Sequence, residues 1–374
     1  MAALTLAALG AALDRSLLHV FVAGPGYGEG IAIALPEQGW LLLDGCETRD
    51  GALPLMAILE QWRQPDEPIN AVLLTHPHAD HAYGLRDLLE TTAPARIGLT
   101  TVPADPERVF RAFGVTPPAP AATREPRLAG RVLEGMLALW RRFDAAPEML
   151  IALVDGAAIP LSTPSVRAHV RAPDLAIVEA HLSSSAPEDS NELSAVIELV
   201  FGATRIVLGS DLPTMSPSGR ELPGGWGSVM TRHPALGAHA GLKIPHHGSP
   251  AAFHAALMTA GAGRAWWISP FNRGKRLPPT SPEGVPRLVS LNGEVALTAT
   301  PRRRDQQPRH ADPGVVTLAE LPALFTPPAS TVAGALLVTP PALGPLEPLW
   351  CGAFDDRGAL RGTWRGERAF TVVP

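Results

Sequence analysis

Short apolar runs bounded by glycine, proline and polar residues recur along this chain. Runs of this length that are rich in valine, isoleucine and leucine predict buried β-strands. The predicted strands are residues 18–22, 31–35, 40–44, 71–74, 96–100, 192–201 and 204–211, with a further short strand in 242–249. Because only the polar turn 36–39 separates two of these runs, residues 31–44 predict a β-hairpin.

Apolar residues with helical spacing lie between the predicted strands. Residues 53–62 and 83–89 show this spacing, and the apolar run 2–13 predicts a helix that enters the domain. Strands that alternate with helices predict a layered α/β domain.

The segment 103–127 has a different character, because it is rich in proline and alanine. Residues 128–143 follow it with the pattern of an amphipathic helix. We interpret 103–143 as an insertion or lid rather than as an independent domain.

Length and composition exclude several classes of protein. The chain of 374 residues, 46% of them hydrophobic, suits one large globular domain with an extension, or two domains. Its formal net charge of -5 provides no global basic field for sequence-independent nucleic-acid binding. No apolar stretch predicts a membrane span. The only cysteines, Cys46 and Cys351, lack the spacing of a disulfide framework or a thiolate metal site, so we predict a cytoplasmic protein.

The most informative residues directly follow one predicted strand. Residues 75–81 read Thr-His-Pro-His-Ala-Asp-His and contain the potential metal ligands His76, His78, Asp80 and His81. Alternate side chains of extended backbone point the same way, so the first two histidines can converge on one ion. The adjacent Asp80 and His81 face differently and can reach a second ion. Imidazole and carboxylate ligands suit Zn²⁺, and on ligand type alone Mn²⁺ or Fe²⁺ are alternatives.

Two later strands also end in side chains that bind metals. Residues 204–211 end in Gly-Ser-Asp, and residues 242–249 end in His-His-Gly-Ser. Taken singly, a Gly-Ser-Asp sequence is most often a turn, and a His-His pair often lies on the surface. Together with residues 75–81 they form a series in which strand after strand ends in a metal-type ligand. This series indicates a shared metal site.

The motifs resemble those of the metallo-β-lactamase-fold hydrolases. The resemblance rests on His76-x-His78-x-Asp80-His81, on Leu-Leu-Leu-Asp-Gly at 41–45, and on the strand ends at Asp211 and 246–249. The ComEC-type branch is the most similar one, through residues 24–33, 191–196 and the Lys-x-Pro-His-His-Gly-Ser sequence at 243–249. The resemblance covers roughly residues 17 to 300. It implies an α/β fold, the αββα sandwich, with metals at one sheet edge.

The resemblance also implies a role for each motif residue. One ion would be bound by His76 and His78, and a second by Asp80 and His81. Asp211 would bridge both ions, and His247 would complete the second. The candidate catalytic residues are Asp80, Asp211 and His246, the last of which would face the substrate.

Two further positions are compared with the family in the same way. Asp44 would orient a ligand histidine from behind. The family usually supplies a third histidine to the first ion, but the matching stretch here reads Arg171-Ala172-Pro173-Asp174. The first ion would therefore be weakly held, completed by water, or absent, which leaves one or two Zn²⁺ ions per chain.

These residues predict a metal-dependent hydrolase that uses a metal-activated water. Two-metal sites suit displacement at phosphorus, so we expect a phosphodiesterase or nuclease. The acidic net charge favours a nucleotide or a short or single-stranded nucleic acid as substrate. Two alternatives stay open: hydrolysis of a thioester or lactam at the same site, and a metal-poor subunit that binds a partner.

The pattern changes beyond residue 300. Residues 301–313 form a charged, proline-containing linker, and residues 333–338 and 349–373 predict short strands joined by turns. We therefore expect a hydrolase domain over 1–300, and over 301–374 a linker with a small β-rich C-terminal extension that could bind a protein partner.

Overall fold

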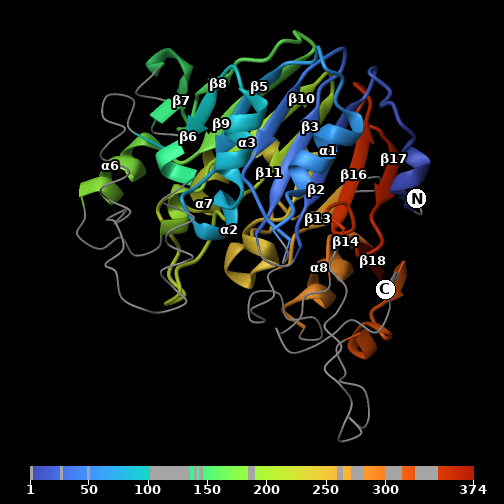
Figure 1. The fold of residues 1–374 in the computed structure, drawn as a ribbon. Coiled ribbons are helices and arrows are strands. Elements are labelled where there is room, and N and C mark those ends of the chain that lie inside the picture. The colour runs from blue at the N-terminus through green and yellow to red at the C-terminus, as the bar shows by residue number, and fades with distance from the viewer. Residues whose placement is uncertain are drawn as a thin grey trace, which may run out of the picture.

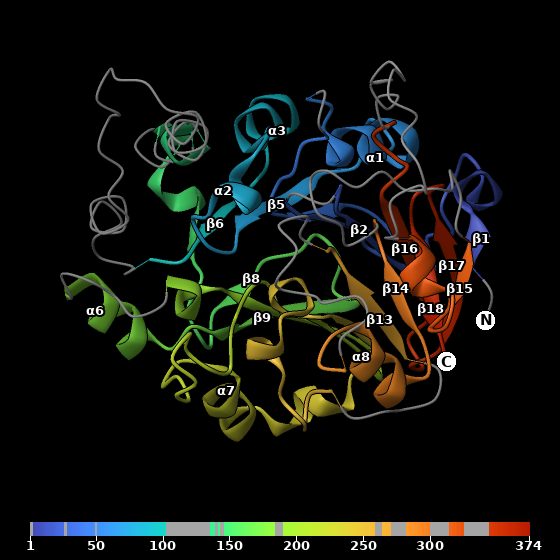
Figure 2. The same cartoon turned by 90° about the horizontal axis from the view of Figure 1, so that it is seen from below.

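The computed structural model describes most of the chain, in eleven segments: residues 3–25, 28–48, 51–101, 135–138, 141–142, 146–183, 190–258, 264–270, 282–299, 314–324 and 344–374. Two nine-stranded sheets pack face to face within these residues. Helices cover the outer face of each sheet, as Figure 2 shows with α1 and α3 on one side and α7 and α8 on the other. The αββα sandwich expected from the sequence is confirmed.

The first sheet is built mainly from the N-terminal half of the chain (Figure 1). Its strand order is β1-β17-β16-β2-β3-β4-β5-β6-β7. The strands are β1 Leu4–Thr5, β2 Leu18–Ala23, β3 Gly30–Ala34, β4 Trp40–Leu43, β5 Ile69–Leu74, β6 Ile97–Leu99, β7 Leu150–Ala152, β16 Leu349–Phe354 and β17 Leu360–Arg365. The predicted hairpin is present as the antiparallel pair β3 and β4, and β4, β5 and β6 run parallel.

The second sheet has the order β15-β18-β14-β13-β12-β11-β10-β9-β8. Its strands are β8 Ala158–Ile159, β9 Val166–Ala172, β10 Val196–Phe201, β11 Thr204–Leu208, β12 Gly241–Lys243, β13 Ala265–Ile268, β14 Val295–Leu297, β15 Val315–Thr317 and β18 Phe370–Val373. The strands β11 to β14 are parallel, so their carboxyl ends lie at one edge of the sheet.

Side chains of the first sheet alternate between two apolar layers. In β2, Val20 and Val22 pack in the layer between the sheets, whereas Phe21 and Ala23 pack with the covering helices. Strands with both faces covered are apolar along their whole length, which explains the continuous runs in the sequence.

Most of the outer helices pack an apolar face against a sheet. The outer helices are α1 Pro54–Trp62, α2 Ala79–Ala82 and α3 Leu85–Thr92 on the first sheet, and α7 Trp226–Arg232 and α8 Val285–Asn292 on the second, with α6 Leu175–Ser183 near one end of the sandwich. The predicted helices 53–62 and 83–89 correspond to α1 and α3. Pro54 occupies the first turn of α1, where its missing N–H costs no hydrogen bond.

Two predictions outside the site have different outcomes. The helix expected over 2–13 is wrong, because the chain forms strand β1 and the short 3-10 helix Leu6–Leu9 there. Gly10 follows with a φ of 79°, a left-handed conformation that ends the turn. The predicted insertion or lid over 103–143 lies almost wholly outside the described residues, although 135–138 and 141–142 are helical.

The C-terminal strands lie within the sandwich. β16 pairs with β2 in the first sheet, and β18 pairs with β14 in the second. The strands predicted over 349–373 are therefore present as edge-side members of both sheets. The division of the chain at residue 300 stays a prediction. Among the described residues, no helix combines the length and apolarity that crossing a lipid bilayer requires.

One buried histidine of the first sheet makes the stability of the fold sensitive to acid. Burial, together with the nearby Arg15, lowers the pKa of His19 to about 4. The unfolded chain binds this proton near pH 6.5, so stability is complete above that pH and falls as the pH drops towards 4. When the pH is lowered from 7 to 5, the unfolding free energy of the wild type should fall. We expect that fall to be about 2 kcal/mol smaller in His19→Phe.

Urea denaturation of both proteins at the two pH values measures this difference. Phenylalanine keeps an aromatic ring beside Trp364, whose ring centroid is 6.4 Å from that of His19. Equal losses in the two proteins would show that the acid sensitivity arises elsewhere.

Candidate metal centre

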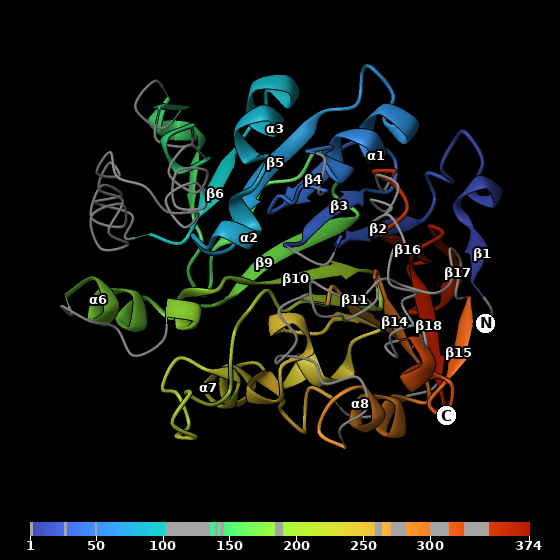
Figure 3. The same ribbon diagram turned by 60° about the horizontal axis from the view of Figure 1, so that its bottom comes forward.

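The carboxyl ends of three strands converge at the border between the two sheets. The turn after β5 leads into α2, which carries Asp80 and His81. Asp211 follows β11, and His247 follows β12. A backbone bond from Ala195 N to Thr75 O, 2.9 Å long, joins the two sheets here. Figure 3 shows α2 beside this border.

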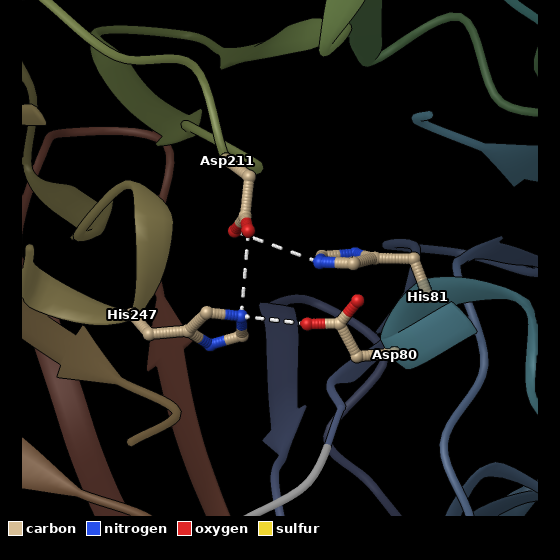
Figure 4. Close-up of side chains that lie close together, drawn as sticks. All are labelled: Asp80, His81, Asp211 and His247. Carbon is tan, nitrogen blue, oxygen red and sulfur yellow. Dashed lines mark hydrogen bonds and ion pairs between the residues drawn. The ribbon is translucent and has the colours of Figure 1, made fainter. Parts of the chain in front are cut away.

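Asp80, His81, Asp211 and His247 form the candidate centre, here named the four-ligand cluster (Figure 4). Each offers one ligand atom, and these atoms all lie within 4.8 Å of one another. The Nε2 atom of His247 is 3.3 Å from Asp80 Oδ2 and 3.4 Å from Asp211 Oδ2. The Nε2 atom of His81 is 3.5 Å from Asp211 Oδ1. Such a set of imidazole and carboxylate atoms suits a Zn²⁺-type cation.

Hydrogen bonds to the Nδ1 atoms of both cluster histidines fix the orientation of their rings. His81 Nδ1 is 2.7 Å from Asp44 Oδ2, a contact that agrees with the predicted orienting role of Asp44. Asp44 is itself held by Thr75, whose backbone N and Oγ1 donate to it at 2.7 and 2.8 Å. His247 Nδ1 lies 2.8 Å from Ser269 O. Both rings therefore present Nε2 to the cluster.

The charges of the cluster favour a cation. Burial lowers the pKa of His247, but Asp211 and Asp80 outweigh burial and raise this pKa to about 9. Burial likewise opposes protonation of His81, while Asp44 and Asp211 hold its pKa well above the ordinary value. Burial raises the pKa of Asp211, yet the neighbouring histidines hold it well below the ordinary range. Protons and a metal ion therefore compete for the same nitrogen atoms.

His76 and His78 lie beside the cluster. The ring of His76 is 4.2 Å from that of His81 and 4.5 Å from that of His78, measured between centroids. His76 Nδ1 contacts the hydroxyls of Thr75 and Ser210, at 3.2 and 3.3 Å. His76 Nε2 is buried and has no hydrogen-bond partner among the described residues, which fits a metal ligand. Burial lowers the pKa of His76 well below its ordinary value, so this ring is neutral.

The other predicted positions are also close to the cluster. His78 Nε2 lies 2.8 Å from Ser190 Oγ. His246 is nearly buried, and its Nε2 is 3.9 Å from Asp211 Oδ2. Ala172, where the family would place a third histidine, is buried at the end of β9. The structure thus brings all the predicted residues to one place, and their individual roles stay predictions.

Two buried charges next to the cluster were not predicted as site residues. Lys243 Nζ is 2.5 Å from Glu29 Oε2, and both side chains are completely buried. Glu29 lies in residues 24–33, one of the stretches that resemble the ComEC-type branch. The signal that could have found Lys243 is compositional, because the chain has only one other lysine, Lys275, among 31 basic residues.

A comparison with known protein families identifies the fold. Residues 24–127 match the family model described as the Metallo-beta-lactamase superfamily. The chain has a metallo-β-lactamase fold. The matched part of this metallo-β-lactamase fold includes Glu29, Asp44 and residues 75–81. Members of the superfamily are mostly metal-dependent hydrolases, and the four-ligand cluster is a potential metal site of that kind. Nothing in the comparisons distinguishes the ComEC-type branch, which stays a prediction.

Solved structures with likeness to this metallo-β-lactamase fold are distant. Zn²⁺-bound PqqB from Methylobacterium extorquens is 15% identical, with a TM-score of 0.31, and the match covers 62% of this chain and 71% of that one. MEM-A1, a subclass B3 metallo-β-lactamase from a soil metagenome library, is 15% identical with a TM-score of 0.33, over 61% and 76% of the two chains. No curated protein matches the chain. These likenesses carry no argument about the substrate.

Proposed function

We propose that this chain is a metal-dependent hydrolase that cleaves phosphodiesters. The observation that carries the proposal is the four-ligand cluster, in which two carboxylates and two oriented imidazoles converge at buried strand ends. Burying two carboxylates close together is costly unless a cation compensates them. A metal ion supplies that compensation.

Different residues of the site would bind the metal, orient the water and contact the substrate. Asp80, His81, Asp211 and His247 would hold one Zn²⁺-type ion, and His76 and His78 would contribute to a second. A bound ion would activate water for attack and neutralise the negative charge that develops on the substrate. With that ion bound, Asp80 and Asp211 would orient the attacking water, and His246, whose Nε2 is 3.9 Å from Asp211 Oδ2, would contact the leaving group.

Two features favour phosphorus as the reaction centre. The predicted ligands of two ions lie side by side, and paired ions suit in-line displacement of a phosphodiester. The net charge of -5 disfavours a long duplex footprint, so the substrate is a nucleotide or a short or single-stranded nucleic acid. A protein partner that binds through residues 301–374, and a cytoplasmic location, remain predictions.

Metal analysis and a substrate screen test this function. We expect the purified protein to bind about two equivalents of transition metal and to cleave a phosphodiester such as bis-p-nitrophenyl phosphate. A chelator should remove both the metal and the activity, and Zn²⁺ or Mn²⁺ should restore them. In the same assay, His78→Ala should lower the activity.

Other outcomes separate the alternatives. Cleavage of a thioester or a lactam, with no phosphodiester cleavage, would assign the same site to acyl substrates. A protein without bound metal, whose properties His78→Ala leaves unchanged, would contradict an enzymatic function and favour a partner-binding subunit.

A further inference from the structure

A completely buried ion pair lies directly beneath the four-ligand cluster. It joins Lys243, the last residue of β12, to Glu29, which precedes β3. Removing two charges from water is costly, and an apolar pair of similar volume is often at least as stable. The stability of the fold alone therefore does not explain why these two residues are charged. Their contacts indicate a different role.

Lys243 holds the loop that presents Asp211. Its Nζ donates to Ser210 O at 3.0 Å, and the backbone N of His246 donates to the same oxygen at 2.9 Å. Ser210 has a φ of 45°, a left-handed conformation that is unfavourable for a residue with a side chain. These two hydrogen bonds stabilise the strained residue immediately before Asp211.

Glu29 connects the ion pair to two other cluster residues. Its backbone N donates to Asp80 O at 3.1 Å. Its Oε2 lies 3.8 Å from His247 Nδ1. The Glu29–Lys243 pair is thus in contact with the segments that carry three of the four cluster ligands.

The position of the ammonium matters for a metal ligand. Lys243 Nζ is only 4.0 Å from Asp211 Oδ1, so this cation and a metal ion attract the same carboxylate. Glu29 is closer to the ammonium and accepts most of its charge interaction. A lysine also fits this place better than an arginine, because its compact ammonium directs three donors to separate acceptors.

We propose that Glu29 and Lys243 are a positioning pair for Asp211. Lys243 fixes the Ser210 loop, and Glu29 keeps the ammonium from pairing with the Asp211 carboxylate, which stays available to a metal ion. This inference rests on the proposed metal site.

The test measures the affinity of the full chain for Zn²⁺ by competition with a chromogenic chelator. We compare the wild type with Glu29→Gln and with Glu29→Gln/Lys243→Met. The double variant should bind Zn²⁺ about 10- to 100-fold more weakly, because the bond to Ser210 O is lost. The Glu29→Gln variant should bind Zn²⁺ still more weakly, because the ammonium of Lys243 then pairs with the carboxylate of Asp211.

The order of the Zn²⁺ affinities of the three proteins distinguishes a positioning role of the pair from a purely structural one. If the pair only filled space, the double variant, which loses more native contacts, would bind Zn²⁺ at least as weakly as the single one. Glu29→Gln/Lys243→Gln is a second variant that retains a donor for Ser210 O. Its affinity should lie between those of the wild type and the methionine variant.

A matched control uses another ion pair, in the second sheet, which also contains Lys243. Glu198 on β10 pairs with Arg171 on β9 and with Arg205, which is near the start of β11 and away from Asp211. Glu198→Gln/Arg205→Met should leave the Zn²⁺ affinity unchanged. Thermal unfolding of each variant in the presence of a chelator reports its metal-free stability separately.

The outcomes distinguish this inference from the proposed function. A wild type that binds no Zn²⁺ contradicts both. A wild type that binds Zn²⁺, together with a single variant that binds as well as or better than the double variant, contradicts only the positioning role.

Discussion

Replacing Asp211 with alanine is expected to abolish metal binding and hydrolysis together. Asp211 is completely buried, and one of its oxygens lies near His81 whereas the other lies near His247. Removing it leaves two buried imidazoles without the carboxylate between them. We expect Zn²⁺ affinity to fall by more than about 100-fold, which exceeds the typical loss for an outer hydrogen-bond partner. Metal content after dialysis and phosphodiester cleavage measure the two effects.

Asp155→Ala is the matched control for this experiment. Asp155 also pairs with a histidine, His233, and with Arg232, but it lies near the surface and outside the cluster. Its loss should change stability by about 1 kcal/mol or less and leave metal binding intact. An Asp211→Ala protein that keeps its full complement of metal would overturn the assignment of the site.

The second large effect is expected from Asp44→Asn, although Asp44 is not a cluster ligand. Its carboxylate accepts three hydrogen bonds, from His81 Nδ1 and from the backbone and hydroxyl of Thr75. Asparagine has almost the same shape but only one acceptor oxygen, so it cannot satisfy His81 and Thr75 together. His81 then loses its fixed tautomer and orientation, and Zn²⁺ affinity should fall about 10- to 100-fold.

Chelator competition measures the affinity of Asp44→Asn, and thermal unfolding of the metal-free protein reports any loss of stability. Thr75→Val provides a graded comparison, because it removes only one of the three bonds to Asp44, together with the contacts of this hydroxyl with His76 and Ser210. It should weaken binding less than Asp44→Asn does. Equal affinities of the wild type and Asp44→Asn would show that His81 needs no such support.

The strands that lead to the site were predictable because burial on both faces makes them apolar throughout. β2, β3, β4 and β5 all match predicted runs within a few residues. β9 was missed even though its residues alternate between buried and more exposed positions, because charged side chains interrupt the apolar run. The helix expected over 2–13 failed for the opposite reason. Its composition is apolar, but Gly10 and pairing of β1 with β17 decide its conformation.

The local spacing of residues in the sequence was sufficient to predict some residues of the candidate site but not others. Asp80 and His81 lie within one short motif, and the fold brings Asp211 and His247 to them, as strand ends in a layered sandwich are expected to do. The pairing of Glu29 with Lys243 depends on the packing of two sheets. No local pattern encodes that contact, so only the three-dimensional arrangement reveals it.

The position of β16 in the first sheet has a consequence for how the protein is made. β2, at residues 18–23, is synthesised long before one of its two neighbours, β16, at residues 349–354. Until residues 349–354 leave the ribosome, β2 exposes an unpaired apolar edge, which is a template for aggregation. Contacts between such distant segments also slow folding. The edge of β2 is therefore unpaired while the residues between the two strands are made, and we expect added chaperone to raise the yield of folded protein.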